Sequence, residues 1–351
     1  MSQKEGDKKM NPPLQKNTRR IQKVSKLVVL LIMLTLVLVM NFYRQIEPVD
    51  LNDTLDRLLV VNQGATTRQI AQSLEKEGLI KNAQVFVLYN RLTGNINKLK
   101  AGHYLLNSAM SLQEISAKLV EGKVATIKFT IPEGYTLKQI ADVLVKKEIT
   151  TEKEFWAVVK EGEFNFSFLK DLPQTENRLE GYLFPDTYKI PIGMPIEDVI
   201  LVMLKQFETV SKRFPPNNSG LTTHEVVTLA SIVEGECFLD KEKPLVASVF
   251  LNRLQIRQRL ESCATVQYAL GEKKKRLLYI DTEIESPYNT YRINGLPPGP
   301  IGCPGEASLR AVLEPADTDY YFFVAKKDNS GEQVFARTFD EHNRNKRELG
   351  Y

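Results

Sequence analysis

The sequence predicts an α+β protein that begins with a transmembrane helix. Three observations support this class: an uncharged apolar stretch at residues 27–43, a strand–turn–helix pattern at residues 61–80 that occurs again at 131–150, and a C-terminal third in which apolar helical segments precede a hairpin pattern. Helical and β segments that follow one another in this way are typical of α+β architecture. A chain of 351 residues is long enough for two modest domains with their own cores.

The stretch at residues 27–43, LVVLLIMLTLVLVMNFY, has 17 residues without a charge, close to the lower limit for a membrane-spanning helix. Residues 1–26 contain eight basic residues: Lys4, Lys8, Lys9, Lys16, Arg19, Arg20, Lys23 and Lys26. Because basic flanks stay in the cytoplasm, we expect residues 1–26 to form a cytoplasmic tail and the rest to be exported. A cleaved signal peptide is the alternative, but no small-residue cleavage site follows the apolar run. We therefore predict a single-pass anchor in the inner (cytoplasmic) membrane.

The positive charge of the chain is concentrated at its N-terminus. The formal net charge is +4, yet residues 1–44 hold nine Lys and Arg against two acids, and the other 307 residues hold 38 bases against 41 acids. The exported part is therefore not basic, and no nucleic-acid partner is expected.

Residues 61–80 (VNQGATTRQIAQSLEKEGLI) and 131–150 (IPEGYTLKQIADVLVKKEIT) are two copies of one pattern. Identical residues occupy seven equivalent positions: Gly64 and Gly134, Thr66 and Thr136, Gln69 and Gln139, Ile70 and Ile140, Ala71 and Ala141, Leu74 and Leu144, and Lys76 and Lys146. Each copy predicts a strand, a glycine turn, a threonine N-cap and an amphipathic helix. Residues 99–106 predict a further strand, and residues 108–122 a partial third copy.

This pattern resembles the LysM fold, a small module that binds glycan chains. We therefore expect a LysM-like module at residues 44–128, and the second copy of the pattern lies in the domain that follows, residues 129–351. A generic α+β packing unit without a glycan-binding role is the alternative, because a fold does not fix a function.

The rest of the chain alternates predicted helices with loops rich in proline and glycine. Residues 179–191 predict an ordered loop or a short strand. Residues 320–327 and 334–339, separated by a turn, predict a β-hairpin. Helices, one of them capped by Thr222 or Thr223, are expected at residues 196–213, 222–235, 243–260 and 306–313.

The stretch TLASIVEGEC at residues 228–237 combines an apolar helix with a carboxylate near its end. A helix that is apolar on nearly every side belongs inside a domain. Glu234 ends this helix, just before Gly235, which suits a left-handed helix cap. Apolar surroundings and the negative end of the helix dipole both raise the pKa of a carboxyl group, so Glu234 is a candidate general acid. A solvated carboxylate at a helix end is the alternative.

Other kinds of site find little support. Glu236 lies two positions from Glu234 and so points away from it, which argues against the paired carboxylates of a retaining glycosidase. HEVVT at residues 224–228 lacks the second histidine of a zinc protease helix, and no phosphate-binding glycine loop or GxSxG elbow occurs. Cys237 lacks a neighbouring cation, so a buried thiol is favoured over a nucleophile. No metal or cofactor is expected.

Six segments arrive in the order found in one known family: LEGYLFPDTY (179–188), LASIVEGE (229–236), VASVFLNRL (246–254), ATVQYALG (264–271), SPYNTY (286–291) and GLPPGPIGCPG (295–305). With the membrane helix and the LysM-like pattern, the chain resembles the YceG-like endolytic murein transglycosylases over nearly its whole length. The resemblance implies that residues 129–351 form the catalytic domain of a peptidoglycan lytic transglycosylase. It also implies glycan strands as substrate and peptidoglycan synthases as partners.

The reaction that the resemblance implies cleaves the MurNAc–GlcNAc bond within glycan strands and leaves 1,6-anhydroMurNAc ends. The catalytic acid of the family falls on Glu234, which would protonate the leaving oxygen and then accept the proton of the C6 hydroxyl. Assistance from the N-acetyl group would replace a second carboxylate. The alternative function is a non-catalytic, membrane-tethered scaffold that binds glycans through its LysM-like repeats.

Polar residues in the matched segments are candidates for substrate binding: Asn252, Arg253, Gln267, Tyr288, Asn289 and Tyr291. The alternative for each is a scaffold role, as for Asn252 and Arg253, which lie on a predicted helix and can pair with buried loop backbone. The chain departs from many relatives at Cys263–Ala264, where they have Asp-Pro, and at Cys303. Because the domain is expected to be exported, we hypothesise a disulfide between Cys263 and Cys303.

Overall fold

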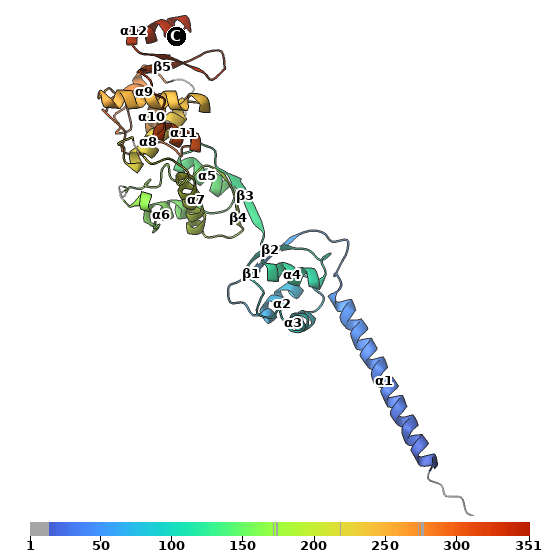
Figure 1. Ribbon diagram of the computed structural model, residues 1–351. Helices are drawn as coiled ribbons and strands as arrows, with labels where there is room; N and C mark the ends of the chain where they lie inside the picture. The colour runs from blue at the N-terminus through green and yellow to red at the C-terminus, as the bar shows by residue number, and fades with distance from the viewer. Residues whose placement is uncertain (1–13, 171, 173–174, 218, 273, 275–276) are drawn as a thin grey trace, which may run out of the picture. The chain divides into compact units, whose positions relative to one another are not determined.

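The structure is a computed structural model that describes residues 14–351 except 171, 173–174, 218, 273 and 275–276, with side chains described from residue 23 onward. The first half of the expected cytoplasmic tail, residues 1–13, therefore lies outside the described residues. The chain divides into two compact units, Met1–Ala125 and Thr126–Tyr351 (Figure 1). Both contain helices and antiparallel strand pairs, so the α+β class is confirmed.

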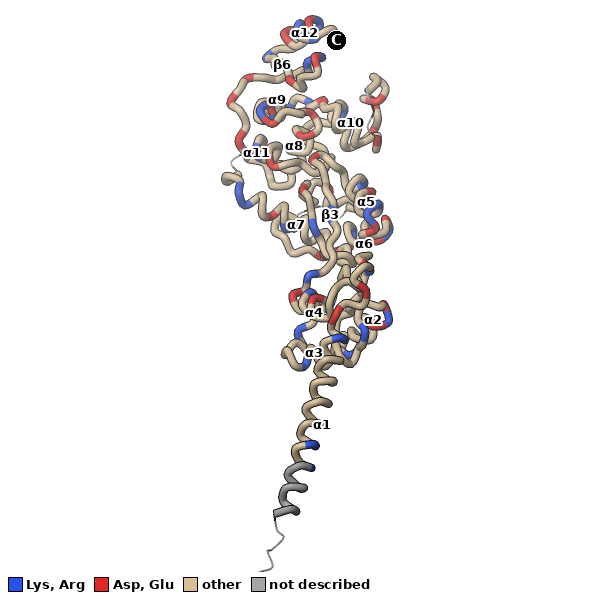
Figure 2. The backbone as a smooth tube through the Cα atoms, turned by 90° about the vertical axis from the view of Figure 1, so that its right-hand side faces the viewer, with Lys and Arg blue, Asp and Glu red and all other residues tan. Residues whose placement is uncertain are grey.

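The N-terminal helix α1 (Leu14–Ile46) is longer than the predicted span. Its segment Lys23–Ile46 has 24 residues, and the most apolar window of 18 residues within it has a mean hydropathy of 2.4 and no buried residue. At 1.5 Å per residue the segment is about 36 Å long, enough for a hydrocarbon core of about 30 Å. Figure 2 shows a long part of α1 without any charged residue. The helix is thus compatible with a membrane anchor.

The first unit continues with one strand pair and three further helices. Strands β1 and β2 pair antiparallel, with Arg57 opposite Leu106 and Val61 opposite Gly102. The core contains Leu59, Leu74 and Tyr104, all nearly inaccessible to solvent. In chain order the elements are β1 (Arg57–Val61), α2 (Thr67–Lys76), α3 (Ala83–Leu92), β2 (Gly102–Leu106) and α4 (Leu112–Glu121).

The repeated pattern has the predicted local structure in both copies. Gly64 and Gly134 turn the chain with φ of 77° and 76°, values that favour glycine. Thr66 and Thr136 then cap α2 and α5 (Leu137–Lys146) in capping boxes. In each helix the isoleucine, alanine and leucine that the copies share are buried, so one pattern builds the same turn and helix in both units.

The second unit contains the longer part of the chain. Its strands form two antiparallel pairs: β3 (Thr126–Thr130) with β4 (Thr187–Pro191), and β5 (Phe322–Ala325) with β6 (Gln333–Ala336). The second pair is the predicted C-terminal hairpin, and β4 is the short strand expected within residues 179–191. The helices are α5, α6 (Glu152–Glu161), α7 (Ile196–Ser211), α8 (Thr223–Glu236), α9 (Lys243–Gln255), α10 (Cys263–Leu270), α11 (Glu306–Leu313) and α12 (Phe339–Glu348).

Two helices differ from expectation. Helix α9 ends at Gln255, five residues early, because Arg257 takes a left-handed conformation with φ of 57° that a helix cannot continue through. Helix α12, with no buried residue, has no apolar stripe that could predict it from sequence.

Candidate active site

Helix α8 is the central element of the second unit. Thr222 caps it in a capping box with Glu225, as predicted, and every residue from Val226 to Val233 is buried. Helices α9, α10 and α11 pack against it, and Figure 1 shows the four helices gathered together. The core on all sides therefore fixes the last turn, which carries Glu234.

Gly235 does not end α8, contrary to expectation. The helix continues through Glu236 and ends at Cys237, which is extended. A Cβ atom on Gly235 would lie 2.6 Å from Cβ of Ala264 in α10, well inside van der Waals contact. The glycine is therefore needed for the close approach of α8 and α10, and not for a left-handed cap.

Glu234 is surrounded by hydrogen-bond donors, where the sequence predicted apolar surroundings. Its side chain is 10% exposed. Oε2 accepts hydrogen bonds from the backbone N–H of Gly305 at 3.0 Å, from Oγ of Ser308 at 2.6 Å and from Nζ of Lys243 at 3.3 Å. Oε1 has one recorded donor among the described side chains, Nζ of Lys243, also at 3.3 Å. One carboxylate oxygen is thus held by three donors, and the other is held by one long contact.

Two of the three donors to Oε2 come from the start of α11. Gly305 is the N-cap of that helix, which has no side-chain cap of its own, and Ser308 lies in its first turn. The carboxylate of Glu234 therefore supplies the missing acceptor and places a negative charge at the positive end of the helix dipole. This arrangement fixes the carboxylate without a second charged residue from α11.

Lys243 is a buried cation, with a side chain only 2% exposed. Its Nζ contacts three carboxyl groups, on Asp240 at 2.9 Å, Glu234 at 3.3 Å and Glu133 at 3.8 Å. Burial lowers the pKa of its ammonium group, but the hydrogen bond that Lys243 donates to Asp240 and the neighbouring negative charges outweigh burial and raise the pKa. Lys243 therefore remains charged in its buried position.

Glu133 brings a second carboxyl group to the same cation, and the sequence did not predict it as a site residue. Both carboxyl groups lie within 3.8 Å of Nζ of Lys243, so they are no more than about 7 Å apart. Burial and the charge of Glu234 raise the pKa of Glu133, with Lys243 acting in the opposite direction. A comparison of the two copies of the repeat could have indicated Glu133, because the first copy has the amide Gln63 at the equivalent position.

The turn that carries Glu133 is fastened through its backbone. Gly134 N–H donates to the carbonyl of Cys303, and Cys303 N–H donates to the carbonyl of Tyr135, both at 2.8 Å. A Cβ on Gly305 would overlap the carboxyl group of Glu133. Glycine at 305 therefore allows Glu133 to lie against the start of α11.

Glu236 has a separate structural role. Its Oε1 accepts from Oγ of Ser262 at 2.6 Å and from the N–H of Ala264 at 3.0 Å, at the start of α10. Because its carboxylate is directed to α10 and that of Glu234 to α11, the two do not form a pair.

A cavity of about 580 Å³ lies beside this cluster. Residues of α5, α6, α8 and α10 line it, among them Trp156, Ser231, Gly235 and Gln267. The carboxylate of Glu234 does not line the cavity, but Gly134 does, and a Cβ at Gly134 would lie 3.7 Å from Cγ of Glu234. Glu234 is therefore next to the cavity, directly behind the Gly134 turn.

Glu180 lines the cavity and is 5% exposed. Burial raises its pKa to about 8, although hydrogen bonds from the Leu137 N–H, the Tyr268 hydroxyl and the Gly181 N–H oppose the rise. Glu180 is not among the site residues predicted from sequence, although it lies in the segment LEGYLFPDTY. A glutamate flanked by buried leucine and aromatic residues was the available signal.

Of the six candidate substrate-binding residues, only Gln267 lines the cavity. Tyr288 packs on Tyr268, which lines the cavity, with ring centroids 4.8 Å apart. Tyr288 is therefore separated from the cavity by the ring of Tyr268. Tyr291 contacts Sγ of Cys263 at 3.3 Å through its hydroxyl.

The amide and guanidinium candidates bond to backbone carbonyls. Asn252 donates to Thr318 and Tyr320, and Asn289 to Thr282 and Ile284. Arg253, which is 7% exposed, donates to the carbonyls of Tyr321, Arg259 and Leu260. These contacts match the scaffold alternative for Asn252, Arg253 and Asn289.

The predicted disulfide between Cys263 and Cys303 is wrong. All three cysteines lie among the described residues, and each is free. Cys303 is buried and its backbone is bonded to the Gly134 turn, whereas Cys263 is exposed beside Tyr291. The two matched segments therefore do not bring their thiols together.

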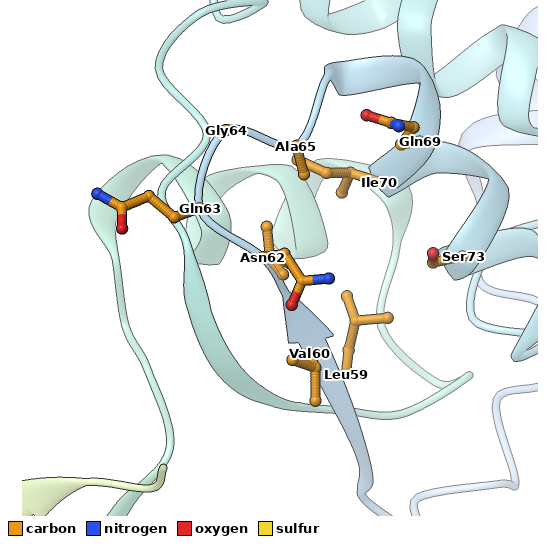
Figure 3. A pocket seen from close by; sticks show the side chains of 10 residues that line it. Leu59, Val60, Asn62, Gln63, Gly64, Ala65, Gln69, Ile70 and Ser73 are labelled. Carbon is orange, nitrogen blue, oxygen red and sulfur yellow. The ribbon is translucent and has the colours of Figure 1, made fainter. Parts of the chain in front are cut away.

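The first unit has a smaller hollow of about 270 Å³. Figure 3 shows that it lies between the end of β1 and helix α2, with Asn62, Gln63 and Gly64 in the turn and Gln69 and Ser73 on the helix. The turn is the counterpart of the one that carries Glu133. In this unit it forms the edge of a surface hollow.

A fixed carboxylate on a buried helix, next to a cavity of ligand size, defines a candidate acid–base enzyme. The chain belongs to the YceG-like family, whose model matches residues 59–348.

Two curated relatives are named endolytic murein transglycosylase. That of Bacillus subtilis (strain 168) is 36% identical over 319 residues, which cover 86% of this chain and 87% of the relative. That of Streptococcus pneumoniae serotype 2 (strain D39) is 33% identical over 330 residues, covering 85% of this chain and 59% of the longer relative.

The fold also matches a crystal structure at 2.6 Å resolution of a protein described as yceG-like from Listeria monocytogenes. The two chains are 35% identical and superpose with a TM-score of 0.56, covering 82% of this chain and 98% of the other. The fold thus agrees with the family.

Proposed function

We propose that this protein is a membrane-anchored endolytic lytic transglycosylase that cleaves the MurNAc–GlcNAc bond within peptidoglycan strands. Family membership makes the chain a lytic transglycosylase, because relatives that align with most of its length carry that name. The observation that carries the assignment to a particular residue is the asymmetric hold on the Glu234 carboxylate.

Glu234 acts through Oε1 in this proposal. Gly305, Ser308 and Lys243 occupy Oε2, so Oε1 is the oxygen that can exchange a proton with a substrate. Protonated Oε1 gives its proton to the glycosidic oxygen, and the C1–O bond breaks. The donors around Oε2 then stabilise the carboxylate that remains.

The second step uses the same oxygen as a base. Oε1 takes the proton of the C6 hydroxyl of the MurNAc residue while O6 forms a bond to C1, which gives the 1,6-anhydro end and restores the acid. No water is consumed. Glu133 and Glu234 share the ammonium group of Lys243, at 3.8 and 3.3 Å.

Product analysis with purified sacculi tests this proposal. The full-length protein in detergent should release glycan fragments of varied length with anhydro ends, each lighter by one water than a hydrolysed end in mass spectrometry. Glu234→Gln should release none, and Glu225→Gln, on the same helix but exposed in a capping box, should retain activity. Thermal unfolding checks that both variants fold.

Hydrated reducing ends would overturn the lytic mechanism. Undiminished release by Glu234→Gln would overturn the role of Glu234.

The anchor is the second part of the proposal. In this proposal residues 27–43 of helix α1 span the inner membrane once, with the basic residues 1–26 in the cytoplasm and the chain after Arg44 outside. This position brings the enzyme to newly made strands and to membrane-bound peptidoglycan synthases. Deletion of residues 1–41 should move the protein from the membrane to the soluble fraction. The truncation keeps Phe42 and Ile46, which pack on the core of the first unit.

A LysM-like glycan-binding role for the first unit is also proposed. The order β1–α2–α3–β2 with antiparallel strands, and the hollow at the turn after β1, support it. Substitution of Asn62 and Gln63 by alanine should reduce retention on sacculi while Glu234 remains active on short soluble strands. If the parent and Glu234→Gln bind sacculi equally and neither cleaves them, the non-catalytic scaffold is the better account.

A further inference from the structure

The cavity beside Glu234 contains a carboxyl group that the proposed chemistry does not use. Glu180 Oε1 accepts from the N–H of Leu137 at 2.9 Å, and Oε2 accepts from the Tyr268 hydroxyl at 3.1 Å. That hydroxyl accepts from Nδ2 of Asn177 at 3.0 Å, so its single proton is directed to Glu180. Among the described residues, the groups bonded to Glu180 are therefore all donors.

A neutral Glu180 has a proton to donate, and the partners recorded for it within the described part of the chain are donors and not acceptors. Burial raises its pKa to about 8, so the carboxyl group is mostly neutral at pH 7. The Leu137 and Tyr268 donors already occupy one position on each oxygen. Glu180 also lines the cavity, so a ligand there can accept this proton. At neutral pH the cavity therefore contains an unused donor.

Gln267 supplies the complementary group. Its Oε1 is buried without a hydrogen-bond partner, and the residue lines the same cavity. Buried polar atoms of folded proteins are nearly always paired, so an orphaned amide oxygen in a cavity indicates a ligand or water donor. The cavity thus offers one donor and one acceptor, the two groups that a secondary amide requires.

Aromatic rings complete the site. Trp156, the only tryptophan of the chain, lines the cavity together with Tyr268. Trp156 is half-buried and so presents part of its ring to the cavity. A volume of about 580 Å³ lies in the usual range of small-ligand sites. An aromatic wall and a donor–acceptor pair together fit the apolar face of a sugar ring that carries an acetamido group.

We propose that this cavity binds an N-acetylated sugar unit, with the acetamide N–H donating to Oε1 of Gln267, the acetamide oxygen accepting from Glu180, and the ring lying on Trp156. The inference rests on the proposed function, in which the ligand is a peptidoglycan strand. It adds the site that recognises the N-acetyl group and the two residues that distinguish this group from a hydroxyl.

The single tryptophan reports on this cavity directly. Titration of the full-length protein in detergent with triacetylchitotriose should change the fluorescence of Trp156 saturably at pH 6.5. Cellotriose, which has hydroxyl groups in place of the acetamido groups, should bind at least about 10-fold more weakly. An N-acetylated dipeptide tests the other source of a secondary amide, the peptide stem, and should give no saturable change.

Two substitutions test the named contacts. Gln267→Leu should weaken binding of triacetylchitotriose about 10-fold while binding of cellotriose remains unchanged. Glu180→Gln keeps an N–H donor of similar shape and should retain binding. If Gln267→Leu fails to fold, as circular dichroism would show, Gln267→Glu replaces the amide with a negative charge of the same size and should also weaken binding.

The pH dependence tests the proton of Glu180. In the parent, binding should weaken as pH rises from 6 to 9, because the ionised carboxylate cannot donate. In Glu180→Gln binding should not change over that range. The other titratable groups that face Glu180 or line the cavity are present in both proteins: Tyr268, Tyr288, Cys303, Lys138, Asp142 and Glu272.

Equal affinity for triacetylchitotriose and cellotriose, a saturable response to the dipeptide, or unchanged binding by Gln267→Leu would each overturn the inference. Failure of the proposed function has a different signature. If sacculi are not cleaved but Trp156 still responds selectively to the acetylated sugar, the cavity inference stands and the transglycosylase assignment falls. Cleavage of sacculi without acetyl selectivity at Trp156 gives the opposite result.

Discussion

Substitution of Gly235 by alanine tests the packing that supports the site. The added Cβ would lie 2.6 Å from Cβ of Ala264, whereas carbon atoms in contact are about 3.5–4.0 Å apart. Helices α8 and α10 must therefore separate by about 1 Å. Overpacking of this kind costs about 1–3 kcal/mol, and the better helix propensity of alanine returns up to about 1 kcal/mol. We expect Gly235→Ala to lower the free energy of unfolding by about 1–2 kcal/mol.

Thermal unfolding of the full-length protein measures this cost. A loss of 1–2 kcal/mol corresponds to a Tm lower by about 2–8 °C for a unit of this size. Because α10 carries Gln267 and Tyr268, the shift should also weaken the fluorescence response of Trp156 to triacetylchitotriose. The matched control is the double variant Gly235→Ala with Ala264→Gly, which moves the methyl group from one helix to the other and should recover most of the Tm.

An unchanged or higher Tm for Gly235→Ala would refute the packing argument. A double variant as unstable as the single one would do the same, because the cost would then come from another contact.

Further predictions concern the charge cluster, the buried acid and the thiols. Lys243→Met should lower the free energy of unfolding, measured in urea, by about 3 kcal/mol, because it leaves Glu234 without its buried cation. Lys243→Arg keeps the charge and should lose less stability. Equal losses in the two variants would contradict the charge argument. The pKa of Glu180 rises to about 8 on folding, so the folded state holds this proton more tightly than the unfolded state. The free energy of unfolding should therefore fall by up to about 4 kcal/mol as the pH rises from 5 to 8. Glu180→Gln should reduce this dependence in thermal melts recorded across the pH range. When the protein is unfolded in iodoacetamide without reductant, mass spectrometry should find all three cysteines alkylated. A single alkylated thiol would support the disulfide between Cys263 and Cys303 after all.

Local features of the fold could be predicted because each depends on neighbouring residues. A glycine followed two positions later by a capping threonine was enough to predict the turns at Gly64 and Gly134 and the helices after them. Two runs of aromatic and β-branched residues separated by a turn likewise predicted the C-terminal hairpin. The family was also recognised from sequence, because six ordered segments specify more than any one motif does.

Features that depend on distant segments could not be predicted. The sequence predicted Glu234 as the candidate acid in an apolar setting. Its observed partners Lys243, Ser308 and Glu133 come from separate elements, so the setting is polar. Gly235 was interpreted from its position at a helix end, while its function lies in contact with another helix. Pairing of thiols depends in the same way on three-dimensional distance.

The reciprocal backbone bonds between Gly134, Tyr135 and Cys303 have a consequence for sequence drift. Main-chain bonds do not depend on side-chain identity, so Glu133 keeps its place when residue 303 changes, provided that the new residue is small and retains its N–H. Proline is the one small residue excluded at position 303, because it has no backbone N–H to donate to the carbonyl of Tyr135. Residue 303 can therefore change among small residues other than proline while the main chain still holds the neighbouring Glu133 in place.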